Sequence, residues 1–418
     1  MKKENITMHV RRTDEPLVHI AIHVPVFETY SIKDDAVLGV YADILTSGAG
    51  KYSREAFTDA LLNLGTTLRV SSAEGRLEVL VTGTEQELKK TLALLTTMLT
   101  SPRFEARELL RIKTHVKNML PLINEDAKSR AYDAFLSRIM HPQDVRYEVM
   151  PDVLVKAVSK VQIRDVKKMH ALRISRGCIV TVGGSEKSVK EVEKTIKKIM
   201  GTDTLPHVYC ENQAVEKREI MLIDIPHKQN VEFTLGCPLP LLPESAEYAG
   251  FVFGMNVLAL QGGFAGRLMS TVREKEGLTY SIYGKVEGVS KDQNGFWRIM
   301  TFFNPKDSVK GLTATLREIK TMQDKGITKS ELVRFKAIMK TRRALKHDSL
   351  VAQVGELHGL KLMGLTYADY EAFIKKVEKL TVEEVNAVMK KYLTPEKIII
   401  SGAGPVAKIK EDLLAFQK

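Results

Sequence analysis

Two polar side chains in the second half of the sequence have the types and spacing to bind the polar groups of a ligand. Arg273 offers a positive charge and five N–H donors, and Tyr280 offers a hydroxyl that both donates and accepts. A turn is predicted between them, which would bring the guanidinium and the phenol to one surface. Such a pair is suited to gripping a peptide carbonyl or an oxyanion. The alternative is structural, with Arg273 pairing to the carbonyls of its own helix end and Tyr280 filling a half-buried sheet position.

The surrounding residues predict the elements that position this pair. A helix is predicted over residues 267–276, with Gly277 at the position after its C-terminus. An alternating strand then places Leu278, Tyr280 and Ile282 on one face. A glycine-rich loop precedes the helix, where the backbone can take positive φ and lie close to a neighbour. The loop glycines are Gly262, Gly263 and Gly266.

An internal repeat predicts the architecture. Each half begins with a strand that leads into an apolar helix. GRLEVLVTG, from Gly75, then matches GFWRIMTFF, from Gly295, and residues 158–184 match residues 377–404 as helix, turn, β-branched strand and glycine. We therefore predict an α/β (α+β) fold with two homologous roll-like halves. Each half is a mainly antiparallel sheet covered by helices on one face.

The composition of individual segments indicates the domain boundaries and the expected location of the protein. Residues 201–217 are polar and lack periodicity, which is typical of a linker, so we expect domains over residues 1–205 and 217–418. The N-terminus lacks the apolar region of a secretory signal, and no run approaches the roughly 20 apolar residues of a membrane span. Three scattered cysteines indicate reduced thiols, so we expect a cytoplasmic protein without membrane association.

The net charge of +12 does not indicate nucleic-acid binding, because the basic residues are dispersed. The densest run, residues 187–198, interleaves two glutamates and keeps an apolar stripe, as a solvated amphipathic helix does. The excess of positive charge is better suited to attracting acidic peptides or an acidic partner subunit.

The segment over residues 262–284 resembles the signature of the C-terminal half of M16 metallopeptidases, the family of pitrilysin, insulinase and mitochondrial processing peptidase. In that signature an Arg and a Tyr seven positions apart contact substrate, and Arg273 and Tyr280 have this spacing. The resemblance therefore implies substrate contact by this pair and the glycine-rich loop. It covers nearly the whole chain, since that family also has paired roll-like halves. The matching residues are Arg267, Leu268, Arg273, Glu274, Gly277, Leu278 and Tyr280.

The zinc motif of a catalytic M16 subunit is not preserved in the first half. That motif is His-x-x-Glu-His on a helix, completed by a further Glu downstream. The aligned residues 39–43 read Gly-Val-Tyr-Ala-Asp, and the downstream position falls near Asn118 or Met119. A lone aspartate does not supply the three or four ligands that zinc needs. The degenerate metal-site positions are thus Gly39, Ala42, Asp43 and Asn118, and no metal cofactor is expected in this chain.

A chain with the Arg/Tyr pair but without the zinc motif resembles the zinc-less subunit of two-chain M16 peptidases. This resemblance implies a non-catalytic subunit of a heterodimer, inactive alone, with the zinc and the His-x-x-Glu-His motif on its partner. The substrate would be a peptide or an unfolded polypeptide. Two alternatives stay open. One is a structural scaffold, like the core subunits of respiratory complexes that descend from this family. The other is a stand-alone peptide-binding protein whose inner sheet edge accepts an extended strand.

Overall fold

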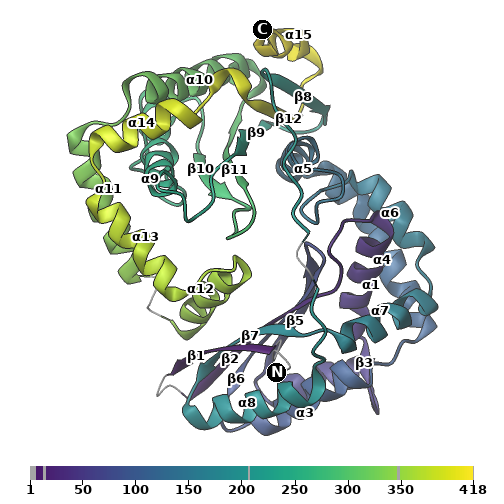
Figure 1. Cartoon of the computed structure of the whole chain (residues 1–418). Helices are drawn as coiled ribbons and strands as arrows, with labels where there is room; N and C mark the ends of the chain where they lie inside the picture. The colour runs from purple at the N-terminus through teal and green to yellow at the C-terminus, as the bar shows by residue number, and fades with distance from the viewer. Residues whose placement is uncertain (1–5, 13–15, 206–207, 346–348, 418) are drawn as a thin grey trace.

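Two five-stranded sheets, one in each half of the sequence, organise the chain (Figure 1). The structure is a computed structural model that describes residues 6–12, 16–205, 208–345 and 349–417. The first five residues, on which the expectation about a signal sequence partly rests, lie outside the described residues. No helix in the described part of the chain is both long enough and apolar enough to cross a membrane.

Helices and strands follow one another in a similar order in the two halves. The first half contains β1 (Ile6–Arg12), β2 (Leu17–Pro25), α1 (Ile32–Leu45), β3 (Gly48–Ala49), β4 (Tyr52–Ser53), α2 (Arg54–Asn63), β5 (Thr67–Ala73), β6 (Arg76–Thr84), α3 (Leu88–Thr100), α4 (Ala106–Glu125), α5 (Ala127–Ile139), α6 (Pro151–Lys160), α7 (Ile163–Ser175), β7 (Cys178–Gly184) and α8 (Glu186–Ile199). The second half contains β8 (Glu219–Asp224), β9 (Val231–Leu239), α9 (Tyr248–Ala259), a π-helical turn (Met269–Lys275), β10 (Ile282–Glu287), β11 (Gly295–Phe303), α10 (Ser308–Lys325), α11 (Lys329–Leu345), α12 (Leu350–Leu362), α13 (Tyr367–Lys379), α14 (Val382–Tyr392), β12 (Ile399–Gly404) and α15 (Lys410–Leu414).

The two sheets have the same topology. Their strand orders are β1-β7-β2-β6-β5 and β8-β12-β9-β11-β10. The edge pairs β1–β7 and β8–β12 are parallel, and every other neighbouring pair is antiparallel. The matched segments that begin at Gly75 and Gly295 contain β6 and β11, which occupy equivalent places in the two sheets. The predicted fold class is confirmed, whereas the boundaries at residues 205 and 217 stay a prediction.

An apolar helix packs on one face of each sheet and forms the centre of that half's core. In the first half this helix is α1, whose start is capped by Ser31, the acceptor of the Asp34 backbone N–H. Eight of its fourteen residues are buried, because α4, α6, α7 and β5 surround it. Its counterpart α9 is more apolar, with no charged residue, and packs against α13, α14 and β10. A helix buried on nearly all sides holds its side chains in fixed places.

Each half also contributes one helix to the sheet of the other half. Helix α5 packs on β9 and β12, and α12 packs on β7, β2 and β1 (Figure 1). On β2, Ile20 and Ile22 face the core of the first half, whereas Ala21 packs with Leu350 and Val354 of α12. The second face of each sheet is therefore covered by a helix from the other half, which the repeat did not predict.

A pair of buried histidines lies where α12 meets the first sheet. His23 Nδ1, on β2, is 2.5 Å from Nε2 of His358, on α12, and the second ring nitrogen of His358 is 2.8 Å from the Thr181 hydroxyl. Glu78 lies 3.5 Å from the other side of His23. Burial and the positive charge of Arg76 nevertheless outweigh that carboxylate and lower the pKa of His23 to about 4. His23 is therefore neutral in the folded chain at neutral pH.

We expect this neutral histidine to make the fold sensitive to acid. Because its pKa is lower in the folded than in the unfolded chain, its contribution to stability is complete above pH 6.5 and is lost as the pH falls towards 4. Between pH 7.5 and 5.0 the loss should be about 2 kcal/mol. In urea unfolding at both pH values, His23→Gln should lose about 2 kcal/mol less than the wild type. An equal loss in the two proteins would contradict this assignment.

Candidate functional site

The predicted helix before the Arg/Tyr pair is a π-helical turn over most of its length. Residues Met269–Lys275 are π-helical, and the backbone N–H of Glu276 bonds to the carbonyl of Thr271, five residues back. Gly277 then takes φ +65°, so the helix ends where the sequence predicted. The wider turn changes the direction in which Arg273 leaves the helix. Such π-helical insertions often occur at functional sites.

The strand predicted over Leu278, Tyr280 and Ile282 begins later than expected. Strand β10 starts at Ile282, and the preceding residues connect it to the π-helical turn. Leu278 and Thr279 are both buried, so this part of the prediction is wrong. Gly277 and the wide turn direct the chain away from the sheet before it enters β10. Tyr280 therefore projects from a loop and is 74% exposed, which excludes the alternative that it fills the sheet.

Arg273 and Tyr280 lie together at the surface, stacked with a third residue. The guanidinium carbon of Arg273 is 4.6 Å from the centre of the Tyr280 ring and 4.8 Å from that of Phe264. Phe264 is 64% exposed, so the three side chains form an open stack. Within the described residues the Arg273 guanidinium has no hydrogen-bond or ion-pair partner, so it does not pair with the carbonyls of its own helix end. Its N–H donors have no acceptor among the described residues and remain available to a ligand.

Arg342, on α11, holds the glycine-rich loop that carries Phe264. Its guanidinium donates to the carbonyls of Gln261 and Gly262 at 2.7 and 2.6 Å. The three loop glycines are needed for the predicted reasons. Gly262 has φ +68°, a Cβ on Gly263 would lie 2.9 Å from the Arg342 guanidinium, and a Cβ on Gly266 would lie 2.8 Å from the backbone nitrogen of Leu260.

Arg267, the first arginine of the segment, has a structural contact. It donates to both carboxylate oxygens of Glu331, on α11, at 2.6 and 2.7 Å, and to the Gly326 carbonyl at 2.7 Å. Burial favours a raised pKa for Glu331, but hydrogen bonds from Arg267 and Thr328 lower it to about 2. This pair therefore fixes the start of the π-helical turn on α11, and Arg273 is the arginine that faces solvent.

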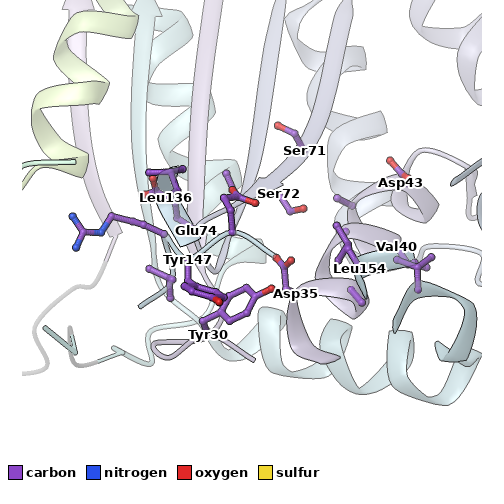
Figure 2. A pocket seen from close by; sticks show the side chains of 18 of the residues that line it. Tyr30, Asp35, Val40, Asp43, Ser71, Ser72, Glu74, Leu136, Tyr147 and Leu154 are labelled. Atoms are coloured by element: carbon purple, nitrogen blue, oxygen red, sulfur yellow. The ribbon is translucent and has the colours of Figure 1, made fainter. Parts of the chain in front are cut away.

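Three of the four degenerate metal-site positions line a cavity between the two halves (Figure 2). Gly39, Ala42 and Asp43 are on α1 and border a cavity of about 660 Å³. Its other walls are β5, parts of α5 and α6, residues 145–148, and the end of β10 with the adjoining turn. Asn118, the fourth position, is an exposed residue of α4, on which Val116 lines the cavity.

These four positions do not fit a zinc ion. Asp43 is the one ionisable ligand among them. Burial raises the pKa of Asp43, and the opposing effect of His115 and Arg111 on α4 is smaller. No group of three or more His, Cys, Asp or Glu side chains that could hold a metal occurs among the described residues. The metal content of the chain stays a prediction that metal analysis must test.

The cavity wall is acidic and aromatic at the N-terminal end of α1. Figure 2 shows Tyr30 beside Tyr147, with Asp35 and Glu74 nearby, and the two tyrosine rings are 5.6 Å apart. Glu148 is exposed into the cavity, yet the surrounding protein desolvates it and, with the neighbouring acids, raises its pKa to about 7. Burial also raises the pKa of Asp35. A wall of this kind is suited to a cationic group.

The structure does not bring the two parts of the predicted site together. Neither Arg273 nor Tyr280 lines the cavity that borders α1. Strand β10 leads from the Tyr280 side to Glu287, which lines the cavity. Five residues of extended strand, at about 3.3 Å each, place Ile282 roughly 16 Å from Glu287, and Tyr280 lies in the loop before Ile282. Arg273 and Tyr280 therefore form a site of their own on the surface of the second half.

Sequence reasoning missed Phe264 and the acidic wall. Phe264 belongs to the glycine-rich loop, and no periodicity indicates that its ring stacks on a side chain nine positions later. Tyr30, Asp35 and Glu148 come from segments with no common motif, and only the packing of α1 brings them together. An aromatic residue among loop glycines is the one signal that could have indicated Phe264.

The sequence is similar to a family model and to proteins from bacteria. Residues 165–339 match the family model described as the peptidase M16 inactive domain, a stretch that contains both Arg273 and Tyr280. The non-peptidase homolog YmxG of Helicobacter pylori is 20% identical over 372 residues, which are 86% of this chain and 83% of that protein. An uncharacterized zinc protease of Mycobacterium tuberculosis is 26% identical over 136 residues, which are 32% of this chain and 31% of that protein.

Solved structures share the fold over nearly the whole chain. A peptidase M16 inactive domain from Pseudomonas fluorescens has a TM-score of 0.81 at 20% identity and covers 96% of this chain and 95% of that chain. A protease from Helicobacter pylori has a TM-score of 0.79 at 14% identity, covering 96% and 97%. The periplasmic protease PqqL from Escherichia coli has a TM-score of 0.71 at 11% identity, where 94% of this chain corresponds to 43% of PqqL.

Proposed function

Because this chain is an inactive member of the M16 peptidase family, we propose that it is the non-catalytic subunit of a heterodimeric M16-type zinc peptidase. Its partner carries the His-x-x-Glu-His motif and the zinc. This chain supplies Arg273 and Tyr280 to the bound peptide, and a cytoplasmic location is part of the proposal. It has no catalytic role alone.

One observation carries the proposal, the open stack of Phe264, Arg273 and Tyr280. An arginine used for stability normally has a carboxylate or carbonyl partner, as Arg267 has in Glu331. Arg273 is held by two exposed aromatic rings, with no acceptor among the described residues. The rings contact the guanidinium without accepting hydrogen bonds from its N–H groups. This arrangement favours a ligand with carbonyl or carboxylate oxygens, as an extended peptide has.

The division of chemistry between two chains is physically consistent. Peptide hydrolysis needs a metal-activated water on one side of the scissile carbonyl, which the partner's zinc would supply. It also needs hydrogen-bond donors for the oxygen that becomes negative in the tetrahedral intermediate. The Tyr280 hydroxyl is an exposed donor suited to that oxygen, and Arg273 is suited to the carbonyls on the C-terminal side of the scissile bond. The two chains would face each other across the substrate.

Reconstitution from separate chains tests this proposal. The purified chain is mixed with the M16 subunit that carries His-x-x-Glu-His in the same genome. Complex formation is measured by size-exclusion chromatography with light scattering, and turnover by a quenched fluorescent peptide. We expect a 1:1 complex that hydrolyses the peptide, with zinc on the partner and little turnover by either chain alone. Stoichiometric zinc and unaided proteolysis by this chain, or failure of the chains to associate, would overturn the proposal.

A second candidate function, binding of a peptide by this chain alone, is favoured by strand β5. This strand is at the edge of the first sheet, is paired with β6 on one side, and lines the cavity with residues 69–73. A free sheet edge beside a cavity can accept an extended peptide as an additional strand. Titration of peptides into the isolated chain separates the two functions, because this candidate requires binding without the partner.

A further inference from the structure

A second cavity, of about 410 Å³, lies wholly within the second half, away from both regions described above. Its walls are Pro243 and Glu244 before α9, α9 itself, the end of α12 with the turn that follows it, α13, and Lys291 in the β10–β11 connection. This volume is within the range of pockets for small molecules. None of its lining residues belongs to the Phe264–Arg273–Tyr280 stack or to the cavity between the halves.

Backbone contacts hold this second cavity open. The turn between α12 and α13 contains Gly364 at φ +72°, and the Leu365 N–H bonds to the Leu360 carbonyl at 2.8 Å. The Lys291 N–H donates to the Met363 carbonyl at 2.8 Å, which ties this turn to the second sheet. The walls are therefore fixed by main-chain geometry. A preformed pocket does not need to be ordered by its ligand, which reduces the entropy lost on binding.

The interior of the cavity is apolar. Met363 and Leu365 line it beside Val252 of α9, and the centres of the mutually tilted Tyr248 and Phe373 rings are 5.9 Å apart. The polar groups of the interior are the phenols of Tyr248, on α9, and Tyr370, on α13. Burial raises the pKa of Tyr248 to about 12, so its phenol stays a neutral hydrogen-bond donor. Aliphatic and aromatic walls of this kind favour a hydrocarbon chain or ring.

The rim of the cavity carries two ammonium groups, Lys291 and Lys376, and two carboxylates, Glu244 and Asp369. Asp369 is already used at the start of α13, where its carboxylate accepts from the backbone N–H and the hydroxyl of Thr366, both at 2.7 Å. Those bonds and, more weakly, Lys291 lower its pKa. Lys376 makes only a 3.5 Å contact to the Glu244 carbonyl. Lys291 and Lys376 are exposed, and neither ammonium has an ion-pair partner within the described residues.

We infer that this cavity binds an amphipathic carboxylate, with its hydrocarbon chain between α9 and α13 and its head group at Lys291 and Lys376. The apolar walls select the chain, and the two ammonium groups select an anionic head. The site borders the C-terminal end of α12. The N-terminal part of this helix packs on the first sheet through Leu350 and Val354. Ligand binding should therefore also stabilise the contact between the halves. This inference does not depend on the proposed peptidase role.

Three probes with the same ten-carbon chain test it by isothermal titration of the full chain below their micelle concentrations. These probes are decanoate, 1-decanol and decyltrimethylammonium. We expect decanoate to bind at one saturable site and to raise the thermal midpoint, 1-decanol to bind at least about fivefold more weakly, and the cation not to bind saturably. Equal affinity for all three head groups, or no saturable binding of decanoate, would overturn the inference.

Variants locate the site. Val252→Phe fills the cavity and should weaken decanoate binding at least tenfold. Ile374→Phe adds a similar ring to the neighbouring 240 Å³ cavity and should leave decanoate binding unchanged. Lys291→Gln with Lys376→Gln should reduce the affinity for decanoate to that for 1-decanol, whereas Lys375→Gln, exposed on the same helix, should not. Circular dichroism checks that each variant is folded. Decanoate binding that Val252→Phe does not weaken would place the ligand elsewhere.

Discussion

Replacing Arg273 by alanine should lower kcat/KM for peptide hydrolysis by the reconstituted two-chain enzyme about 100-fold or more. Loss of a charged hydrogen bond to a substrate carbonyl commonly costs about 1.5–3 kcal/mol, and the Tyr280 hydroxyl, the donor to the oxyanion, also loses the group that contacts its ring. Here the change also removes the cation between the Phe264 and Tyr280 rings, which are both exposed. The measurement is steady-state turnover of a fluorescent peptide at saturating concentrations of both subunits, so that a change in subunit affinity does not contribute.

Conservative variants of the pair separate the hydrogen bond from the stacking. Tyr280→Phe keeps the ring over Arg273 but removes the hydroxyl, so kcat should fall with little change in KM. Arg273→Lys keeps the charge but not the planar fork of donors, and its activity should lie between those of the wild type and the alanine variant. Lys275→Ala, an exposed change in the same π-helical turn, is the matched control. Wild-type turnover by Arg273→Ala would refute a substrate role for the pair.

The architecture was predictable because the repeat is expressed in local patterns. Matching strands and helices at a nearly constant offset lead to two sheets with the same strand order. The start of α14 is likewise set by a local pattern, a capping box between Thr381 and Glu384. The crossing of α5 and α12 to the opposite sheets was not predictable. Amphipathic periodicity shows that a helix has an apolar face, but it does not show which of two similar sheets that face will cover.

Only the part of the candidate site that lies within a few consecutive residues of the chain was predictable. Seven residues separate Arg273 from Tyr280, and Gly277 marks the turn between them, so their meeting followed from the chain direction. The π-helical turn inserts an extra residue that no periodicity signals, and it moves the start of the strand to Ile282. Phe264 and the acidic wall of the inter-half cavity depend on packing between distant segments, which one sequence does not reveal.

A buried ion pair lies where the two halves meet, and we expect it to contribute strongly to the free energy of unfolding. Asp144 and Arg146, in the segment between α5 and α6, are 2.7 Å apart, with side chains 1% and 7% exposed. Arg146 also donates to the carbonyls of Gly288 and Asn294, beside β10 and β11, at 2.7 and 3.0 Å. One residue of the first half thus holds the turn of the second half that borders the inter-half cavity.

Arg146→Met should therefore lower the free energy of unfolding by about 3–5 kcal/mol, because it leaves the Asp144 carboxylate buried without its cation. Asp144→Asn should cost a similar amount, and the double variant less than the sum of the two, since it removes both charges together. Lys320→Met, which removes an exposed pair with Asp324 on α10, is the control and should cost no more than about 0.5 kcal/mol. Denaturant unfolding followed by circular dichroism measures all four variants. Additive single-variant costs would show that Arg146 acts through its carbonyl contacts to the second half rather than through the ion pair.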